Sequence, residues 1–174
     1  TGEAPMGLWP DIIARTGVDQ NPLNVGDSDV AEKLLAYCWA DQHERLKRLE
    51  AAIATARAFP PDMERGDAAD WIEQKLATGQ GEGVARIIMH SVFWQYVPTP
   101  SQNRIEAAIL AAGAAATPSR PLAWLSFEPE PLTIAPMQLT LKLWPFGESI
   151  HLATCHPHGR TIIWLWKLMF LWPM

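Results

Sequence analysis

The sequence predicts a single α/β domain, spanning residues 1–174, on a mostly parallel open sheet that finishes with antiparallel strands. Short apolar runs alternate with helical patterns as far as Glu128, which is typical of parallel β-α-β units. Strand-like runs joined by short turns, with no helix between them, then complete the chain. The change of rhythm predicts a parallel sheet with an antiparallel edge.

Each element is placed by its hydrophobic period and its boundary residues. Helices are placed where apolar residues recur at helical spacing after a capping signal, and strands where an apolar run is short and bounded by turn residues. In order, the predicted elements are a strand at 12–19, helices beginning at Asp29 and Asp41, a strand at 63–66, a helix beginning at Asp67, a strand at 84–90, a helix at 105–116, and strands at 121–127, 137–144, 150–155 and 161–166. Residues 84–90 are almost continuously apolar, which predicts a central strand covered on both faces.

Composition and charge narrow the range of partners. Apolar residues make up 48% of the chain, charged residues 19%, and the net charge is −5. The longest basic stretch, Arg45-Leu46-Lys47-Arg48, lies between glutamates on a predicted helix, so we expect no nucleic-acid partner. No segment reaches the roughly 18 to 20 apolar residues of a membrane span, so we expect no membrane partner. Cys38 and Cys155 lack metal or redox spacing and predict buried free thiols in a cytoplasmic protein.

Polar residues after the predicted parallel strands are the candidates for a site. Ligands of open α/β sheets bind beyond the carboxyl ends of the strands. Asp19 follows the strand at 12–19, and its carboxylate either accepts the two hydroxyls of a ribose or makes the local turn with Asn21. Asp67 is either a contact for adenine or the N-cap of its helix.

The second pair of predicted strands supplies three further candidates. His90 and Ser91 leave the strand at 84–90, and Glu128 ends the strand at 121–127. His90 is interpreted either as a general base or substrate contact, or as a histidine packed and bonded at a strand end. Ser91 lies outside any Gly-x-Ser-x-Gly elbow, which argues against serine-hydrolase chemistry.

Three other patterns are interpreted as structural. His156 and His158 lie in a predicted turn without a complete ligand set, so we expect no bound metal. The triplet Gly79-x-Gly81-x-Gly83 leaves a helix and enters a strand, the reverse of a phosphate-binding loop. The tryptophans of the strand runs are assigned to packing rather than to a ligand platform: Trp124, Trp144, Trp164 and Trp166.

Several short strings along the chain share the order and spacing of a bacterial family. They are Gly17-Val18-Asp19-x-Asn21-Pro22, Trp39-x-Asp41-Gln42-x-Glu44-Arg45, Gly66-Asp67-Ala68-x-Asp70-Trp71, His90-Ser91 with Tyr96-x-Pro98, Pro121-Leu122-Ala123-Trp124 through Glu128, and His156-Pro157-His158-Gly159. With these strings the chain resembles the domain of unknown function 2332 family, matching the C-terminal half of that family. Ala40, where the family favours proline, and the tail after Trp166 depart from the family pattern.

The resemblance implies a methyltransferase-like Rossmann fold with a possible pocket for S-adenosylmethionine (AdoMet). It does not imply a known reaction. With such a fold, the residues that follow the predicted strands would supply the site: Asp19, Asp67, Ala68 and Ser91 as cofactor contacts, and His90 and Glu128 as catalytic residues. The family's first strand and its glycine-containing cofactor loop have no counterpart here, so we expect a piece of a longer chain. The substrate would be a small molecule or a protein. The alternative function is a non-catalytic Rossmann-like scaffold or a homodimerisation module, favoured by the Trp-rich tail.

Overall fold

The structure, a computed structural model, describes residues 10–129, 136–157 and 160–165. The chain divides into two compact units, and the division falls between Trp71 and Ile72. This division lies inside helix α3 (Ala68–Ala77). The protein is a mixed α/β structure with a two-stranded sheet in the first unit and a five-stranded sheet in the second.

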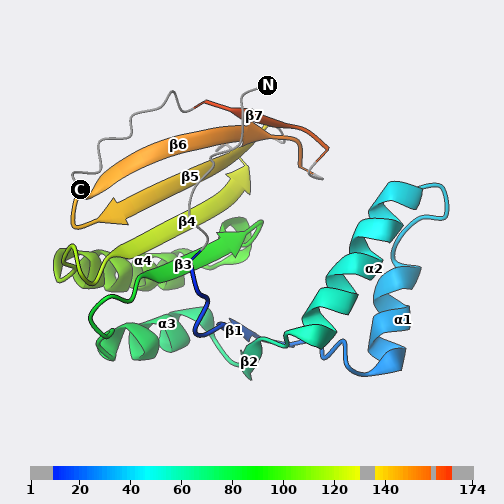
Figure 1. Ribbon diagram of the computed structural model, residues 1–174, viewed down its shortest axis with the longest axis horizontal. Helices are drawn as coiled ribbons and strands as arrows, with labels where there is room; N and C mark the ends of the chain where they lie inside the picture. Colours follow the sequence, from blue (N-terminus) through cyan, green and yellow to red (C-terminus); the bar gives the residue numbers. More distant parts are fainter. Residues whose placement is uncertain (1–9, 130–135, 158–159, 166–174) are drawn as a thin grey trace. The chain divides into compact units, whose positions relative to one another are not determined.

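The N-terminal unit combines a strand pair with a helical hairpin. Its elements, in chain order, are β1 (Thr16–Asp19), α1 (Ser28–Ala36), α2 (His43–Ala58) and β2 (Asp62–Arg65). β1 and β2 pair in parallel, from Thr16 opposite Asp62 to Asp19 opposite Arg65. The helices lie beside each other (Figure 1) and bury Ala31 and Ile53. Burial of these small and branched side chains is what holds the two helices together.

The C-terminal unit is a five-stranded sheet with helical connections at its start. After α3 its elements are β3 (Arg86–Ser91), the 3₁₀ turn η1 (Trp94–Tyr96), α4 (Thr99–Ala114), β4 (Leu122–Pro129), β5 (Met137–Trp144), β6 (Glu148–Cys155) and β7 (Ile162–Trp164). The strand order follows the chain order from β3 to β7. β3 and β4 are parallel and are joined through α4, whereas the later strands form an antiparallel meander (Figure 1).

The two faces of the five-stranded sheet have different coverings. On one face α4 packs on β4 and β5, and Gly113 of α4 lies so close to Trp144 that a Cβ atom there would overlap the indole ring. Leu122, opposite Trp144 in the register, shares this face and is buried. On the other face a core cluster forms around Met137, Ala153 and Cys155. Strand alternation therefore sends consecutive residues of β4 to two separate environments.

The antiparallel finish is confirmed, but the expectation of a mostly parallel sheet is wrong. Two of the described strand pairings are parallel, β1 with β2 and β3 with β4, and three are antiparallel. Short connections force this result, because only an antiparallel pair can be joined by a tight turn. The turn between β5 and β6 contains Gly147 at a φ of +71°, a conformation that glycine adopts without steric cost.

The predicted central position of β3 is also wrong within the described sheet. β3 forms one border of the five strands, and its side chains alternate between half-buried and exposed. Ile87 and Met89 are 63% and 67% exposed. A short apolar run alone does not distinguish a strand covered on both faces from a border strand, which is why the predicted central position is wrong.

Candidate functional site

His90 and Glu128 form a close polar pair at the carboxyl-terminal ends of two parallel strands. His90 lies opposite Ser126 in the register of β3 and β4, and Glu128 is two residues farther along the same face. The Nδ1 atom of His90 lies 2.7 Å from Oε1 of Glu128. The two side chains are only 13% and 16% exposed, so water screens this contact weakly.

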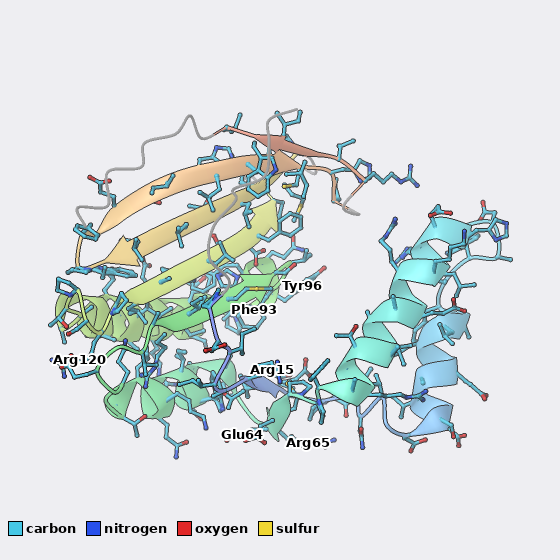
Figure 2. The ribbon with its side chains drawn as sticks, in the orientation of Figure 1. Arg15, Glu64, Arg65, Phe93, Tyr96 and Arg120 are labelled. Carbon is cyan, nitrogen blue, oxygen red and sulfur yellow. The ribbon has the colours of Figure 1, made fainter. Side chains whose placement is uncertain are left out.

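The backbone after β3 fixes the carboxylate in place. Oε1 of Glu128 also accepts hydrogen bonds from the backbone N–H groups of Phe93, at 3.0 Å, and Trp94, at 3.3 Å. Figure 2 shows Phe93 and Tyr96 where the chain leaves β3. The carbonyl oxygen of Trp94 in turn accepts a hydrogen bond of 2.8 Å from the side chain of Gln102 in α4. The turn at Phe93 and Trp94 therefore holds Glu128 in place, and the negative charge of Glu128 in return stabilises this turn.

Val92, between β3 and this turn, has an unusual backbone conformation. Its φ is +49°, in the left-handed region that β-branched residues rarely adopt. Such strain costs of the order of 1–3 kcal/mol and is concentrated at functional sites, where the surroundings enforce it. The positive φ of Val92 redirects the chain so that the N–H groups of Phe93 and Trp94 point at Glu128.

Aromatic rings surround the imidazole of His90. Trp94 stacks on it with ring centroids 5.3 Å apart and an interplanar angle of 26°. Trp124 lies at 6.0 Å in a tilted arrangement, and Phe93 meets the ring edge-on at 5.9 Å. The rings restrict the rotation of the imidazole and lower the local dielectric constant.

A cavity of about 310 Å³ opens at this cluster. It is lined by His90, Trp94, Glu106, Trp124, Ser126, Glu128, Pro129, Gln138 and Thr140. Three of these residues carry a buried polar atom that has no hydrogen-bond partner: Nε2 of His90, Oε2 of Glu128 and Nε1 of Trp124. Buried polar atoms are nearly always paired in native proteins, so three such atoms at one cavity indicate a place for a polar ligand.

The His90–Glu128 contact determines what the free ring nitrogen can do. A carboxylate only accepts hydrogen bonds, so the neutral imidazole carries its proton on Nδ1 and points it at Glu128. The lone pair is then on Nε2, the atom left without a partner. This arrangement can accept a proton from a bound molecule while the carboxylate stabilises the resulting imidazolium.

Two other sequence-predicted residues, Asp19 and Asp67, make local hydrogen bonds. Oδ1 of Asp19 accepts a hydrogen bond of 2.7 Å from the backbone N–H of Asn21, which makes the expected turn. Oδ1 of Asp67 accepts hydrogen bonds from the N–H groups of Ala69 and Asp70, at 2.8 and 3.2 Å, and so caps α3.

The structure shows a direct contact between two of the six candidate residues, His90 and Glu128. Asp19, Asp67 and Ala68 belong to the N-terminal unit, whereas His90 and Glu128 belong to the C-terminal unit. Ser91, the last residue of β3, is exposed and does not line the cavity at His90. A crevice shared by Asp19, Asp67 and His90 therefore stays a prediction, as do the individual roles of these residues.

Comparison with known proteins adds a family. A family model described as "Uncharacterized protein conserved in bacteria (DUF2332)" matches residues 1–164. The chain belongs to this family. The match covers nearly the whole chain, so the restriction of the DUF2332 resemblance to a C-terminal half is not supported, whereas the family itself is confirmed. No curated protein and no solved structure matches this DUF2332 chain.

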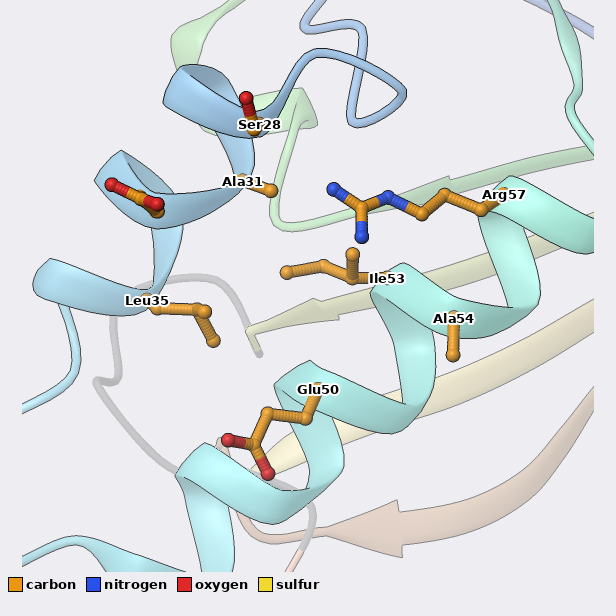
Figure 3. A pocket seen from close by; sticks show the side chains of 8 residues that line it. Ser28, Ala31, Leu35, Glu50, Ile53, Ala54 and Arg57 are labelled. Atoms are coloured by element: carbon orange, nitrogen blue, oxygen red, sulfur yellow. The ribbon is translucent and has the colours of Figure 1, made fainter.

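A second cavity of this DUF2332 protein lies between α1 and α2. Its volume is about 340 Å³, and Figure 3 shows Ala31 and Leu35 of α1 facing Ile53 of α2 across it. Arg57 at its rim donates a hydrogen bond of 2.8 Å to the carbonyl oxygen of Val25. None of the buried unpaired polar atoms of the described residues lies here, so we interpret the cavity as a groove between packed helices.

Neither a metal cluster nor a spanning helix is found in the part of the DUF2332 chain that the structure describes. No group of three or more His, Cys, Asp or Glu side chains is arranged to hold a metal ion within residues 10–129, 136–157 and 160–165. His158 lies outside these ranges, so the metal-free turn at His156 and His158 stays a prediction. Over the same ranges, no helix has the length and apolar character needed to cross a bilayer.

Sequence reasoning missed several residues of the DUF2332 site. Trp124 was assigned to packing, yet its indole forms a wall of the cavity, and Trp94, Gln138 and Thr140 were not considered at all. One signal was available: Trp124, Ser126 and Glu128 alternate along β4 and must share a face. The contribution of β5 depended on its register with β4, which the sequence does not specify.

Proposed function

We propose that the cavity at His90 is the active site of an enzyme, in which His90 acts as general base and Glu128 orients it. One observation carries the proposal: Nε2 of His90 lies buried and unpartnered at a cavity, while Nδ1 is bound to a carboxylate that backbone N–H groups hold in place. A histidine that only packs at a strand end would satisfy both of its nitrogens.

The chemistry that this pair supports is the removal of a proton from a bound hydroxyl, amine or water. The proton moves to Nε2 of His90, and the negative charge of Glu128 stabilises the imidazolium at a distance of 2.7 Å. Proton transfer of this kind typically contributes about 10²–10⁴-fold to a rate. Glu128 is a positioning residue in this scheme, because its Oε1 contacts His90 rather than the reacting atoms.

We infer further that the two β-α-β segments derive from a methyltransferase-like Rossmann arrangement. The parallel pairs β1–β2 and β3–β4, each separated along the chain by helices, support this inference, as does the sequence resemblance. The antiparallel meander from β4 to β7 distinguishes the protein from a purely parallel Rossmann sheet.

The residues proposed for AdoMet do not by themselves make a site that fits it. Asp19 and Asp67 each use an oxygen on a backbone N–H group, and neither they nor Ala68 nor Ser91 line the cavity at His90. AdoMet binding therefore rests on the resemblance alone, and no step of the proposed reaction is derived from it.

The general-base proposal is tested by turnover in a bacterial metabolite extract. The extract is incubated with wild-type protein, with His90→Asn and with His43→Asn, and its components are followed by mass spectrometry. We expect at least one component to be consumed by the wild type and by His43→Asn, whose histidine is exposed on α2, but about 10²-fold more slowly by His90→Asn. Equal consumption by His90→Asn, or none by any protein, would contradict the proposal.

The alternative is a non-catalytic scaffold or homodimerisation module. It is favoured by the exposure of Ile87 and Met89 on β3, because border strands with exposed apolar side chains are prone to pair with other chains. Of the Trp-rich tail that suggested this alternative, Trp164 belongs to β7, and residues 166–174 lie outside the described residues. Light scattering after size exclusion would support it if a dimer of the wild type became a monomer in Ile87→Lys.

A further inference from the structure

The cavity at His90 has a one-sided distribution of charge. Two carboxylates, Glu106 of α4 and Glu128 of β4, line it, and the lining residues that the structure describes include neither lysine nor arginine. The described residues of the cavity thus offer a bound anion no cationic partner except a protonated His90, which Glu128 already neutralises. Placing a ligand carboxylate or phosphate beside these groups would carry an uncompensated cost of desolvation.

Two indole rings form the apolar wall of the same cavity. The centroids of Trp94 and Trp124 are 5.8 Å apart, with the planes inclined at 57°, so the rings meet at an angle rather than lying in one stack. The face of an indole ring attracts cations more strongly than that of any other aromatic side chain. Two indoles with two carboxylates are a combination typical of sites for ammonium groups.

The unpartnered atoms specify which hydrogen bonds the ligand should make. Oε2 of Glu128 and the lone pair of Nε2 of His90 are acceptors, and the N–H at Nε1 of Trp124 is a donor. An ammonium group supplies several N–H donors, and a neighbouring oxygen would satisfy the indole. A ligand with these groups would pair all three buried atoms at once.

We propose that the cavity binds a small organic amine in its cationic form, with an ether, hydroxyl or carbonyl oxygen near the nitrogen. The inference rests on the proposed function, since it names the substrate class of the same site. The ammonium lies between the indole rings and the carboxylates, and the oxygen accepts from Trp124. The charge of the described lining disfavours anionic metabolites, including phosphates and carboxylic acids.

The test compares three probes that share one skeleton and differ in charge: benzylamine, benzyl alcohol and benzoate. Binding to the full chain at neutral pH is followed through the indole N–H resonances in ¹H–¹⁵N spectra, with the resonance of Trp124 identified by its loss in Trp124→Phe. If Trp124→Phe fails to fold, the Trp124 resonance is assigned with Trp94→Phe instead. That variant removes the Trp94 resonance and shifts the resonance of Trp124, whose ring is its neighbour. Benzylamine carries the ammonium group without the oxygen, so it tests the charge preference alone. We expect its ring and charge to shift the Trp124 resonance by proximity, and we expect it to bind at least about tenfold more tightly than benzyl alcohol. Benzoate should not compete.

A variant that removes one negative charge tests whether the cavity carboxylates cause the preference for benzylamine. Glu106→Gln keeps the shape of the side chain, and we expect it to weaken benzylamine several-fold while leaving benzyl alcohol unchanged. The control is Glu32→Gln, an exposed carboxylate on α1 in the N-terminal unit, which should alter neither affinity.

The outcomes separate this inference from the general-base proposal. Benzoate binding as tightly as benzylamine, or equal weakening of benzylamine by both Gln variants, would overturn the amine class while leaving His90-dependent turnover intact. A Trp124 resonance that none of the probes moves would also overturn it. Selective benzylamine binding without His90-dependent turnover would support the ligand class and contradict the catalytic role.

Discussion

At the scale of single residues, the two carboxylate oxygens of Glu128 have different roles. Oε1 accepts from His90 and from the backbone of Phe93 and Trp94, whereas Oε2 is buried without a partner at the cavity. One oxygen therefore maintains the fold and the other is available to a ligand. A buried, half-satisfied carboxylate of this kind is costly, which is why it points to function.

Removing this carboxylate should destabilise the protein. Glu128→Ala leaves the N–H groups of Phe93 and Trp94 and the Nδ1–H of His90 without their acceptor. Each buried donor left unpaired costs about 1–3 kcal/mol, partly offset here by the release of the buried charge, so we expect a loss of about 2 kcal/mol in the free energy of unfolding. Urea denaturation measures it. Glu106→Ala, at an exposed position of α4, should stay within about 0.5 kcal/mol of the wild type, and an equal loss in both variants would count against the assigned hydrogen bonds.

The two cysteines should differ in reactivity. Both are free thiols, as the sequence predicts, but only Cys155 is buried, at 4% exposure, while Cys38 is half-buried. Burial raises the pKa of the Cys155 thiol, so at mildly alkaline pH it holds less of the reactive thiolate than an ordinary cysteine. We expect iodoacetamide to label Cys38 first in the native protein, as mass spectrometry of peptides would show. The difference should disappear in urea, and faster native labelling of Cys155 would contradict its placement in the core cluster.

At the scale of elements, the helix α4 fits its sheet through a single glycine. A Cβ atom at Gly113 would overlap the indole of Trp144, so Gly113→Ala forces the helix away from β5. Overpacking of this kind costs about 1–3 kcal/mol, although alanine is the better helix former. Thermal unfolding should show a lower midpoint for Gly113→Ala. Gly79→Ala is the matched control, because no atom lies within 4 Å of a Cβ there, and a similar loss in that variant would show that the crowding at Trp144 is not the cause.

Sequence patterns predicted which helices and strands exist better than they predicted the residues at which these elements begin and end. The strand at 137–144 coincides with β5, since apolar and polar residues alternate there between clear turn signals. The helix predicted at 105–116 instead begins at Thr99, because its first turn, Thr99-Pro100-Ser101-Gln102, is polar and carries no periodicity. Proline in a first turn is compatible with a helix and was the signal available. The strand predicted from residue 12 begins at Thr16, beyond the exposed Ile12 and Ile13.

The candidate site was predictable as far as strand topology reached. The rule that polar residues after parallel strands meet at one edge singled out His90 and Glu128, which lie 38 residues apart in sequence and in contact in the structure. The aromatic wall was not predictable, because a tryptophan that packs and one that lines a cavity have the same pattern in a strand. Likewise the backbone donors at Phe93 and Trp94 depend on the unusual φ of Val92.

At the scale of the whole molecule, we expect this chain to bind AdoMet weakly or not at all. In a Rossmann-type site the cofactor rests on a glycine-rich turn between a strand and a helix. The triplet at 79–83 instead connects α3 to β3, as the sequence predicts, and Asp19 and Asp67 are engaged in their turn and cap. Loss of such contacts should cost about a thousandfold in affinity. Titration calorimetry with micromolar AdoMet should give no saturable heat, and a saturable signal that Asp19→Ala abolishes would contradict this expectation.

Because of the register between β3 and β4, deletions within these strands should be tolerated less well than deletions in the loops. His90 faces the cavity because it pairs with Ser126, and side chains alternate between faces with a period of two. Deletion of one residue within β3 or β4 would turn His90 or Glu128 toward the opposite face, whereas the same deletion in the loop at 79–83 shifts neither. Insertions and deletions inherited by DUF2332 proteins should therefore accumulate in such loops, and a strand of altered length would mark a protein in which His90 and Glu128 no longer share a cavity.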